Sequence, residues 1–227
     1  MKTIGIIGGM SWESTIEYYR IINSLVNKKL SGLHSAKMII ESYDFDEIEK
    51  NQSLENWEEL TKILINSAQK LEKAGADFIA IATNTMHLAA DDVQKNISIP
   101  LIHIAEAATN YIKENNIHTA ALFGTKYTMT KSFYKDKLKE FGINVIIPNI
   151  EQQNIINKII YDELCKGIIK ENSRREINNI IQNCAEKGAE CAILGCTELP
   201  NIIKNADIKI INTTEVHCIE IVKRILN

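Results

Sequence analysis

The sequence predicts an α/β fold built from two similar domains, each a parallel sheet between two layers of helices. Three observations lead to this prediction. Short apolar, β-branched runs alternate with longer segments of helical spacing, which is typical of parallel sheets. The alternation restarts near the middle of the chain. The 227 residues, of which 45% are hydrophobic and 24% charged, suffice for two compact globular domains.

The first half of the chain contains four predicted strands, each followed by a predicted helix. The strands are the apolar runs at residues 2–9, 35–45, 77–83 and 99–105. The helices have apolar residues at helical spacing and cover residues 11–30, 53–75, 86–96 and 106–116. Gly-Gly closes the first strand, Ser11 offers an N-cap to the first helix, and Gly75 ends the second.

The second half repeats this order. Its predicted strands cover residues 119–125, 144–149, 191–196 and 209–214. Its predicted helices cover 129–142, several segments between 151 and 187, and the C-terminal stretch to 227. We therefore expect an N-terminal domain of residues 1–104 plus 212–227 and a C-terminal domain of residues 105–211.

The two halves resemble each other residue by residue, which indicates an internal duplication. Three blocks recur in the same order: residues 9–19 with 124–134, 74–85 with 187–198, and 99–107 with 208–216. The first block has an offset of 124 − 9 = 115, and the second places Thr83 on Cys196 because 196 − 83 = 113. The alternative is that any two α/β halves look alike.

Thr83 and Cys196 each follow a predicted buried strand and precede a predicted helix. Duplicated halves usually face each other about a pseudo-twofold axis, and loops at the carboxyl ends of parallel strands line the ligand crevice. The two loops are therefore expected to approach one ligand from opposite sides, in a cleft between the domains. That geometry suits a reaction at a carbon that must be reached from both faces.

Composition excludes several classes of function. The net charge is −3, and the 26 basic and 29 acidic residues are well mixed, so nucleic-acid binding is not expected. No apolar run approaches the roughly 20 residues that span a bilayer, so no membrane partner is expected. The N-terminal apolar stretch is too short for a signal peptide. The five cysteines form no C-x-x-C pair, so neither a zinc site nor a disulfide framework is expected, and reduced thiols indicate a cytoplasmic protein.

The chemistry that fits two opposed loops is stereoinversion, in which one group removes a proton from carbon and another delivers one to the opposite face. A thiol with an ordinary pKa of about 8.5 can be tuned toward neutrality by its surroundings. Cys196 stands in "ILGCTELP", where the N–H groups of a following helix would stabilise a thiolate. The other four cysteines are interpreted as structural residues in helices or strands.

Four segments together resemble the aspartate/glutamate racemase family, which is independent of pyridoxal phosphate: "IGIIGGMSWESTIEYYRIIN", "ATNTMH", "IIYDELCKG" and "ILGCTELP". The resemblance implies two similar α/β domains, an active site between them, an acidic amino acid as substrate, no cofactor, no metal and often a homodimer. It also implies a two-base mechanism carried by Thr83 and Cys196. The commoner family pattern has "CNT" where this chain has "TNT". The chain therefore resembles the L-aspartate/glutamate-specific subgroup, with Cys196 as the base on the L-face and Thr83 as the proton donor on the opposite face.

Residues flanking this pair are candidate ligands of the substrate's α-carboxylate. Asn84, Thr85 and Thr197 can donate hydrogen bonds to it, or can instead cap the helices that follow. Glu198 either orients Cys196 or caps its helix.

The remaining candidates border the expected pocket. Met10 and Ser11 lie in the first strand-to-helix turn, and Thr125 lies in the matching turn of the second half. By the family resemblance, Lys166 pairs with the side-chain carboxylate of the substrate, or is otherwise a solvated lysine at a helix end. Gln52 stands where relatives place a polar or basic contact. A neutral glutamine there would loosen a site matched to aspartate and admit glutamate.

Two other classes of function fit the same pattern. Hydantoin racemases, maleate isomerases and arylmalonate decarboxylases share the duplicated fold and a central cysteine. A chain that has lost one cysteine could also be a racemase-derived protein that only binds acidic amino acids. The histidines show no pairing pattern and are interpreted as core or helix residues; they are His34, His87, His103, His118 and His217.

Overall fold

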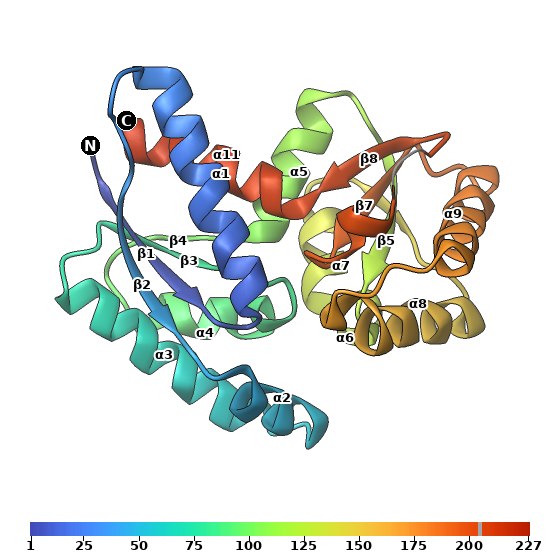
Figure 1. Ribbon diagram of the computed structural model, residues 1–227, viewed down its shortest axis with the longest axis horizontal. Coiled ribbons are helices and arrows are strands. Elements are labelled where there is room, and N and C mark those ends of the chain that lie inside the picture. The colour runs from blue at the N-terminus through green and yellow to red at the C-terminus, as the bar shows by residue number, and fades with distance from the viewer. Residues whose placement is uncertain (204–205) are drawn as a thin grey trace. The chain divides into compact units, whose positions relative to one another are not determined.

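The structure is a computed structural model that describes residues 1–203 and 206–227. The chain divides into two compact units, which Figure 1 shows with their elements labelled. Unit 1 is Met1–Ile104 with His217–Asn227, and unit 2 is Ala105–Val216. The sequence placed the return of the chain into the first domain at residue 212. The division falls instead at His217, inside the last helix.

Unit 1 is built on a parallel sheet with the order β2-β1-β3-β4. Its strands are β1 (Thr3–Gly8), β2 (Lys37–Ser42), β3 (Phe78–Ile81) and β4 (Leu101–Ile102). The helical segments of this part of the chain are α1 (Trp12–Leu30), α2 (Phe45–Ser53), α3 (Trp57–Lys73), the 3-10 turn η1 (Thr85–Ala89), α4 (Ala90–Lys95) and α11 (Thr213–Leu226). β1 and β3 are buried almost throughout, as expected for central strands covered on both faces.

Two apolar clusters fill the faces of this sheet. On one face, Tyr18 and Ile22 of α1 pack with Ile221 of α11 against Ile4 and Phe78. On the other face, the apolar stripe of α3 packs against residues that alternate outward from β1 and β3; its buried members include Leu60, Leu64 and Leu71. The result is the predicted three-layer αβα arrangement.

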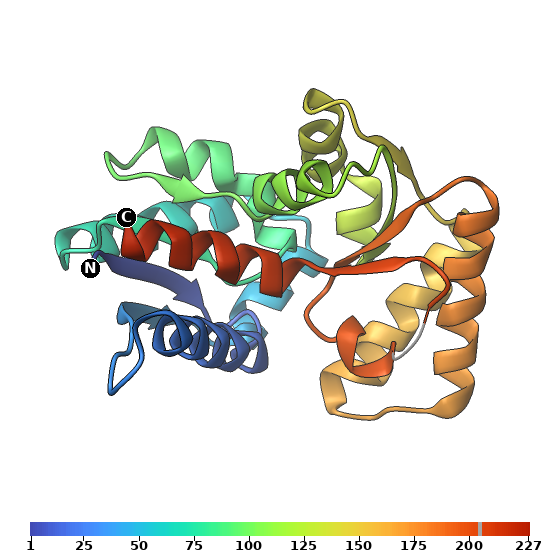
Figure 2. The same cartoon turned by 90° about the horizontal axis from the view of Figure 1, so that it is seen from above.

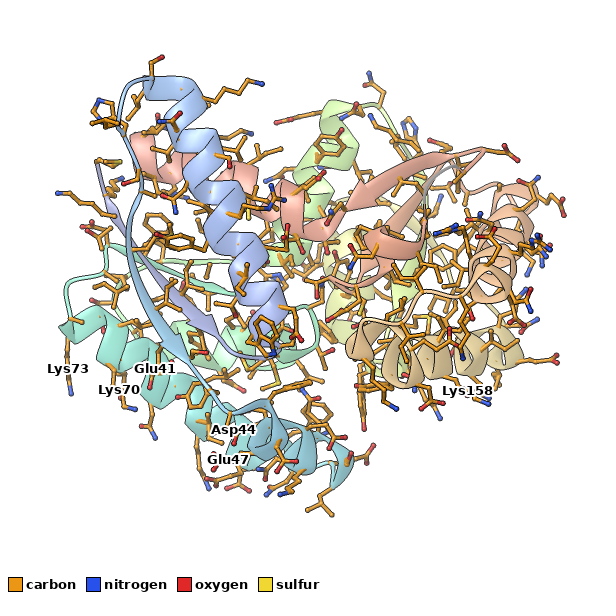
Figure 3. All side chains as sticks on the ribbon, in the orientation of Figure 1. Glu41, Asp44, Glu47, Lys70, Lys73 and Lys158 are labelled. Atoms are coloured by element: carbon orange, nitrogen blue, oxygen red, sulfur yellow. The ribbon has the colours of Figure 1, made fainter. Side chains whose placement is uncertain are left out.

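The edge strand β2 is tied to α3 by a charged cluster that Figure 3 labels in part. Glu41 accepts hydrogen bonds from Lys70 Nζ at 2.8 Å and from Ser67 Oγ at 2.7 Å. Partial burial opposes ionisation of Glu41, but these hydrogen bonds and the Lys70 charge hold its pKa below the ordinary value. The cluster therefore has a structural role, which is to hold β2 against α3.

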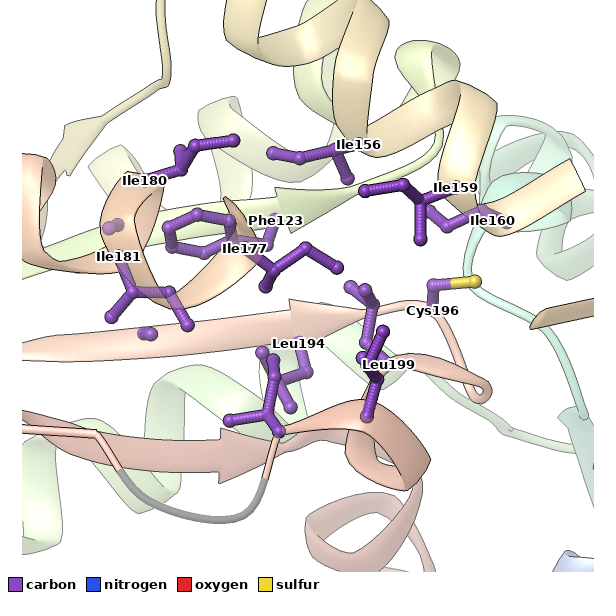
Figure 4. Packing of buried hydrophobic residues seen from close by; sticks show 14 of the residues in the cluster. Phe123, Ile156, Ile159, Ile160, Ile177, Ile180, Ile181, Leu194, Cys196 and Leu199 are labelled. Atoms are coloured by element: carbon purple, nitrogen blue, oxygen red, sulfur yellow. The ribbon is translucent and has the colours of Figure 1, made fainter. Parts of the chain in front are cut away.

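Unit 2 repeats the design with the sheet order β6-β5-β7-β8, again parallel. Its strands are β5 (Thr119–Gly124), β6 (Asn144–Ile146), β7 (Cys191–Gly195) and β8 (Lys209–Asn212). The helical segments are α5 (Ile104–Glu114), α6 (Lys126–Thr130), α7 (Ser132–Glu140), α8 (Ile150–Asp162), η2 (Leu164–Lys166), α9 (Glu171–Glu186) and α10 (Leu199–Ile202). Figure 2 shows α8 and α9 on one side of the sheet and α5 and α7 on the other. The side of α8 and α9 holds the apolar cluster of Figure 4, with Phe123 and Leu194 from the sheet.

The strand registers of the two units confirm the duplication and correct its alignment. In unit 1, Ile4 pairs with Phe78; in unit 2, Ala120 pairs with Cys191. β1 and β5 are both six residues long and both end in glycine, so matching them end to end places Ile4 on Ala120 and gives offsets of 120 − 4 = 116 and 191 − 78 = 113. The first offset is one greater than the sequence alignment suggested, so Gly8, rather than Gly9, matches Gly124. The second offset is the predicted one, and it makes Thr83 and Cys196 equivalent.

Several predicted helices are broken where the backbone leaves helical geometry. The predicted helix at 53–75 is α3 alone, and α2 precedes it, because Glu55 between them has φ = 53°. The predicted helix at 129–142 is α6 and α7, separated by the extended Lys131. Gly167, in the left-handed region, ends η2 within the stretch predicted as helices between 151 and 187.

Candidate active site

In unit 1, the loop that carries Thr83 is fastened to the first strand-to-helix turn. The Ala82 amide donates to Ile7 O at 2.9 Å, and Ser14 Oγ donates to Ala82 O at 2.7 Å. Ser11 begins α1 as its N-cap and accepts from the Ser14 amide at 3.3 Å. Since β1 and β3 are parallel, their carboxyl ends meet at one edge of the sheet. Ser11 and the half-buried Thr83 therefore lie at this edge.

The first turn needs glycine at position 9. Gly9 has φ = 81°, and a Cβ there would lie 2.3 Å from the main-chain N and O of Tyr43. The turn therefore packs directly against the segment that leaves β2.

Gln52 is brought to the Thr83 loop by α2, a helix that the sequence interpretation missed. Its side chain is 5% exposed, and its Nε2 donates to Met86 Sδ at 3.1 Å. Met10 and Met86 belong to one buried apolar cluster. Met10 and Gln52 thus gather around the residues that follow Thr83.

Asn84 and Thr85 begin the 3-10 turn η1 and are both buried. The Asn84 side chain makes no capping hydrogen bond, so its interpretation as a helix cap is wrong. The predicted helix at 86–96 starts as this 3-10 turn and continues as α4.

In unit 2, Cys196, Thr197 and Glu198 form one hydrogen-bonded group. Cys196 Sγ and Thr197 Oγ1 both donate to Glu198 Oε2, each at 2.8 Å. Cys196 is 8% exposed, and Figure 4 shows it at the margin of the apolar cluster beside Ile159 and Leu199. Glu198 therefore orients the thiol, as one of the two sequence interpretations expected, and makes no side-chain capping bond.

The expected stabilisation of a Cys196 thiolate is wrong for this state of the protein. Burial, and then the negative charge and hydrogen bond of Glu198, raise the pKa of the thiol well above its ordinary value. The backbone N–H of Glu198 acts in the opposite direction but is outweighed. The following helix, α10, has only four residues, so its dipole offers little compensation. Cys196 is a protonated thiol in this arrangement.

Thr125 and Lys166 complete the predicted set in unit 2. Thr125 is the N-cap of α6 and directly follows Gly124, which pairs with Gly195, the residue before Cys196. Lys166 ends η2, is exposed, and forms no salt bridge within the described residues. Its neighbour Cys165 is exposed, contrary to the structural role expected of it, and lies near enough to contribute to the raised pKa of the Cys196 thiol. η2 therefore lies near the Cys196 group.

His87, which the sequence interpretation assigned to a helix or to the core, is a buried residue that contacts Thr83. Its ring is buried, and Nδ1 lies 2.7 Å from Thr83 O. The sequence signal for this contact is the spacing of Thr83 and His87, because residues four apart meet on one helical turn.

No group of three or more His, Cys, Asp or Glu side chains suited to a metal ion occurs within residues 1–203 and 206–227. In the same part of the chain, no helix combines the length and apolar character that a membrane span requires.

The family profile of Asp/Glu/hydantoin racemases matches residues 7–221. The chain belongs to this family. Among solved structures, a protein from Yersinia pestis with a provisional Asp/Glu racemase name is 43% identical to this chain, with a TM-score of 0.95 over 100% of both chains. An aspartate racemase homologue from Pyrococcus horikoshii is 38% identical with a TM-score of 0.88, again over 100% of both chains.

Among curated proteins, the broad specificity amino-acid racemase RacX of Bacillus subtilis (strain 168) is 30% identical over 162 residues. The match covers 69% of this chain and 68% of the relative. The predicted family and the predicted pair of αβα domains are therefore confirmed, and the named relatives are racemases, a class of isomerase.

Proposed function

We propose that this protein racemises L-glutamate, L-aspartate or both by proton transfer at Cα, without a cofactor. Cys196 is the base on the L-face, and Thr83 is the proton donor on the opposite face. The observation that carries the proposal is the equivalence of these residues in the two units, each two positions beyond a matched strand pair. Membership of the racemase family supports the same conclusion.

Cys196 must lose its proton before it can act as the base. In the resting arrangement the thiol donates to Glu198 at 2.8 Å, and its raised pKa keeps it protonated. Once that proton has passed to water, the thiolate takes the Cα proton of the L-amino acid and becomes a thiol again, and the substrate becomes a carbanion. Such a carbanion needs electrostatic stabilisation, for which hydrogen-bond donors around its carboxylate are suited. Asn84, Thr85 and Thr197 are our candidates for these donors, with Met10, Ser11 and Thr125 bordering the pocket.

Thr83 then delivers a proton to the opposite face of the carbanion. A threonine hydroxyl is a far weaker acid than a thiol, but the carbanion is strongly basic and can take its proton. Water restores the proton to Thr83 afterward. In the reverse direction the Thr83 oxygen would have to act as a base, which it does poorly at pH 7. The enzyme therefore turns over L-substrates faster than D-substrates in their initial rates, while the equilibrium constant is unchanged.

Lys166 and Gln52 are the candidates for recognising the side chain of the substrate. Lys166 is exposed near the Cys196 group and forms no salt bridge in the described residues, so its ammonium can take a carboxylate. Gln52 is neutral and buried beside Met86. Lys166→Met should raise the KM for acidic amino acids and leave the KM for neutral ones unchanged. An equal effect on both would contradict its assignment.

The decisive experiment follows the Cα proton by NMR while L-glutamate, L-aspartate and a hydantoin are each incubated with the protein in deuterium oxide. We expect loss of the Cα–H signal from an acidic L-amino acid, with the deuterated D-enantiomer appearing later. Cys196→Ser should reduce this exchange by roughly a hundredfold or more, which is the usual size of a general-base contribution. Cys184→Ala is the matched control, because Cys184 is a buried cysteine of the same apolar cluster on α9.

The outcomes separate the alternatives. Absence of exchange from every acidic amino acid refutes the racemase proposal and favours a protein that only binds them. Exchange from the hydantoin alone favours that branch of the family. Exchange that survives in Cys196→Ser refutes the role of Cys196.

We also propose that the protein is a homodimer, as the family resemblance implies. Light scattering should then give about twice the chain mass, 2 × 25.7 kDa. A mass of one chain at micromolar concentration would contradict this.

A further inference from the structure

A network of buried histidines in unit 1 contacts the backbone of Thr83. His87 and His217 have ring centroids 5.8 Å apart, and His103 lies 4.7 Å from His87. His87 is 2% exposed and His217 is fully buried. Histidines at this depth need partners for both ring nitrogens, so their hydrogen bonds define their protonation.

The hydrogen-bond partners of His87 determine which of its ring nitrogens carries hydrogen. Nδ1 lies 2.7 Å from Thr83 O, which as a carbonyl can only accept, so Nδ1 carries hydrogen. The Ile104 amide donates to Nε2 at 3.1 Å, so Nε2 carries none. His87 is therefore neutral, with its proton on Nδ1, and it links the Thr83 carbonyl to the residue after β4.

His217 has the opposite arrangement. Its Nε2 lies 2.9 Å from the Ile102 carbonyl and must donate, and Nδ1 accepts from the Tyr18 hydroxyl at 2.7 Å. His217 thus ties α1 to β4 without contacting the Thr83 carbonyl. It is a buried histidine of the same cluster with a different backbone partner.

We propose that His87 is a positioning residue for Thr83. The two carbonyls on either side of the Thr83 nitrogen and Cα are both held, Ala82 O by Ser14 and Thr83 O by His87. Holding both peptide groups fixes the backbone angles of Thr83 and therefore the position of the Cβ that carries its hydroxyl. A proton donor must be held to within about 0.5 Å of its productive position, and a displacement of about 1 Å can cost a hundredfold in rate.

The inference rests on the proposed function, and the two faces of that reaction supply its test. In deuterium oxide, a carbanion formed by Cys196 has two fates. Cys196 can return a deuteron, after its thiol proton has exchanged with the solvent, to give deuterated L-substrate, or Thr83 can deliver one to give deuterated D-product. The ratio of D-product to exchanged L-substrate reports Thr83 separately from Cys196, and from the amount of folded enzyme.

We expect His87→Leu to lower this ratio by roughly tenfold or more, because the Thr83 carbonyl loses its donor. His87→Asn should recover most of the loss, since the amide of asparagine can donate from nearly the same place as Nδ1. His217→Asn is the matched control and should leave the ratio within about twofold. An unchanged ratio in His87→Leu, or an equal fall in His217→Asn, would overturn the proposal.

Two further results keep the test independent. If the wild type exchanges no proton at all, the proposed function fails, whereas exchange with an unaltered ratio in the variant refutes only the role of His87. If His87→Leu does not fold, nitrogen-15 NMR of the wild type at pH 7 decides. His87 should show a protonated Nδ1 and His217 a protonated Nε2. A proton on Nε2 of His87 would exclude the hydrogen bond on which the proposal depends.

Discussion

Acidification from pH 7.5 to 5 should destabilise unit 1 through its buried histidines. Burial lowers the pKa of His87 to about 4, against the weaker effect of its hydrogen bond with Thr83. Burial, helped by the neighbouring His87, lowers the pKa of His217 to about 3. Tyr18 and His103 are the other titratable side chains in contact with this pair.

The sign and size follow from proton linkage. A histidine in the unfolded chain has a pKa near 6.5, so below this pH the unfolded chain binds protons that the folded chain does not bind. The contribution to stability is complete above pH 6.5 and is lost as pH falls toward the folded-state pKa. From pH 6.5 to pH 5 the contribution of each histidine to the free energy of unfolding falls by about 2 kcal/mol, which is 1.5 pH units at about 1.36 kcal/mol per unit. The pair should therefore lower the free energy of unfolding by up to about 4 kcal/mol.

Urea unfolding followed by tryptophan fluorescence measures this loss in the right unit, because both tryptophans, Trp12 and Trp57, belong to unit 1. Most carboxyl groups titrate below this pH window, so histidines dominate it. His87→Asn and His217→Asn should each remove about half of the pH dependence between pH 7.5 and 5. An unfolding free energy that stays constant over this range in the wild type would refute the reasoning. So would an undiminished slope in both variants.

Three other predictions concern the site. Because the raised pKa keeps the Cys196 thiol protonated, kcat/KM for the L-substrate should rise about tenfold per pH unit between pH 7 and 9. Glu198→Gln should move this rise in kcat/KM to lower pH, because it removes a negative charge beside the thiol. A kcat/KM of the wild type that does not change between pH 7 and 9 would mean that the thiol does not lose its proton to solvent. Thr83→Cys should increase initial turnover of D-glutamate by roughly tenfold or more because a thiolate is the better base at neutral pH, and an unchanged rate would show that base strength does not limit that direction. Gly9→Ala should lower the free energy of unfolding in urea by about 3 kcal/mol, against about 1 kcal/mol for the control Gly32→Ala, because both have positive φ but only the first would also place a Cβ against main-chain atoms.

Local patterns were sufficient for the fold and for the equivalence of Thr83 and Cys196 in the two units. Buried parallel strands read as continuous apolar runs, and helices as a periodic stripe, so the alternation of the two could be followed along the chain. The duplication then placed Thr83 on Cys196, and the strand registers reproduce that match. The same alignment was one residue out at Gly9, because glycines adjacent in sequence give two equally good matches to Gly124.

The surroundings of these residues depended on contacts that no local pattern contains. The sequence suggested that Cys196 would be tuned toward a thiolate, but burial and the Glu198 carboxylate raise its pKa. His87 is the core residue that the sequence predicted, but its contacts with Ile104 after β4 and with His217 of α11 appear only in the fold. Periodicity reports which face of an element is buried, so the sequence by itself determined the layers, the duplication and the position of the catalytic candidates. Hydrogen-bond partners and proton affinities arise from groups distant in sequence that meet out of contact with water, and these only the tertiary structure decided.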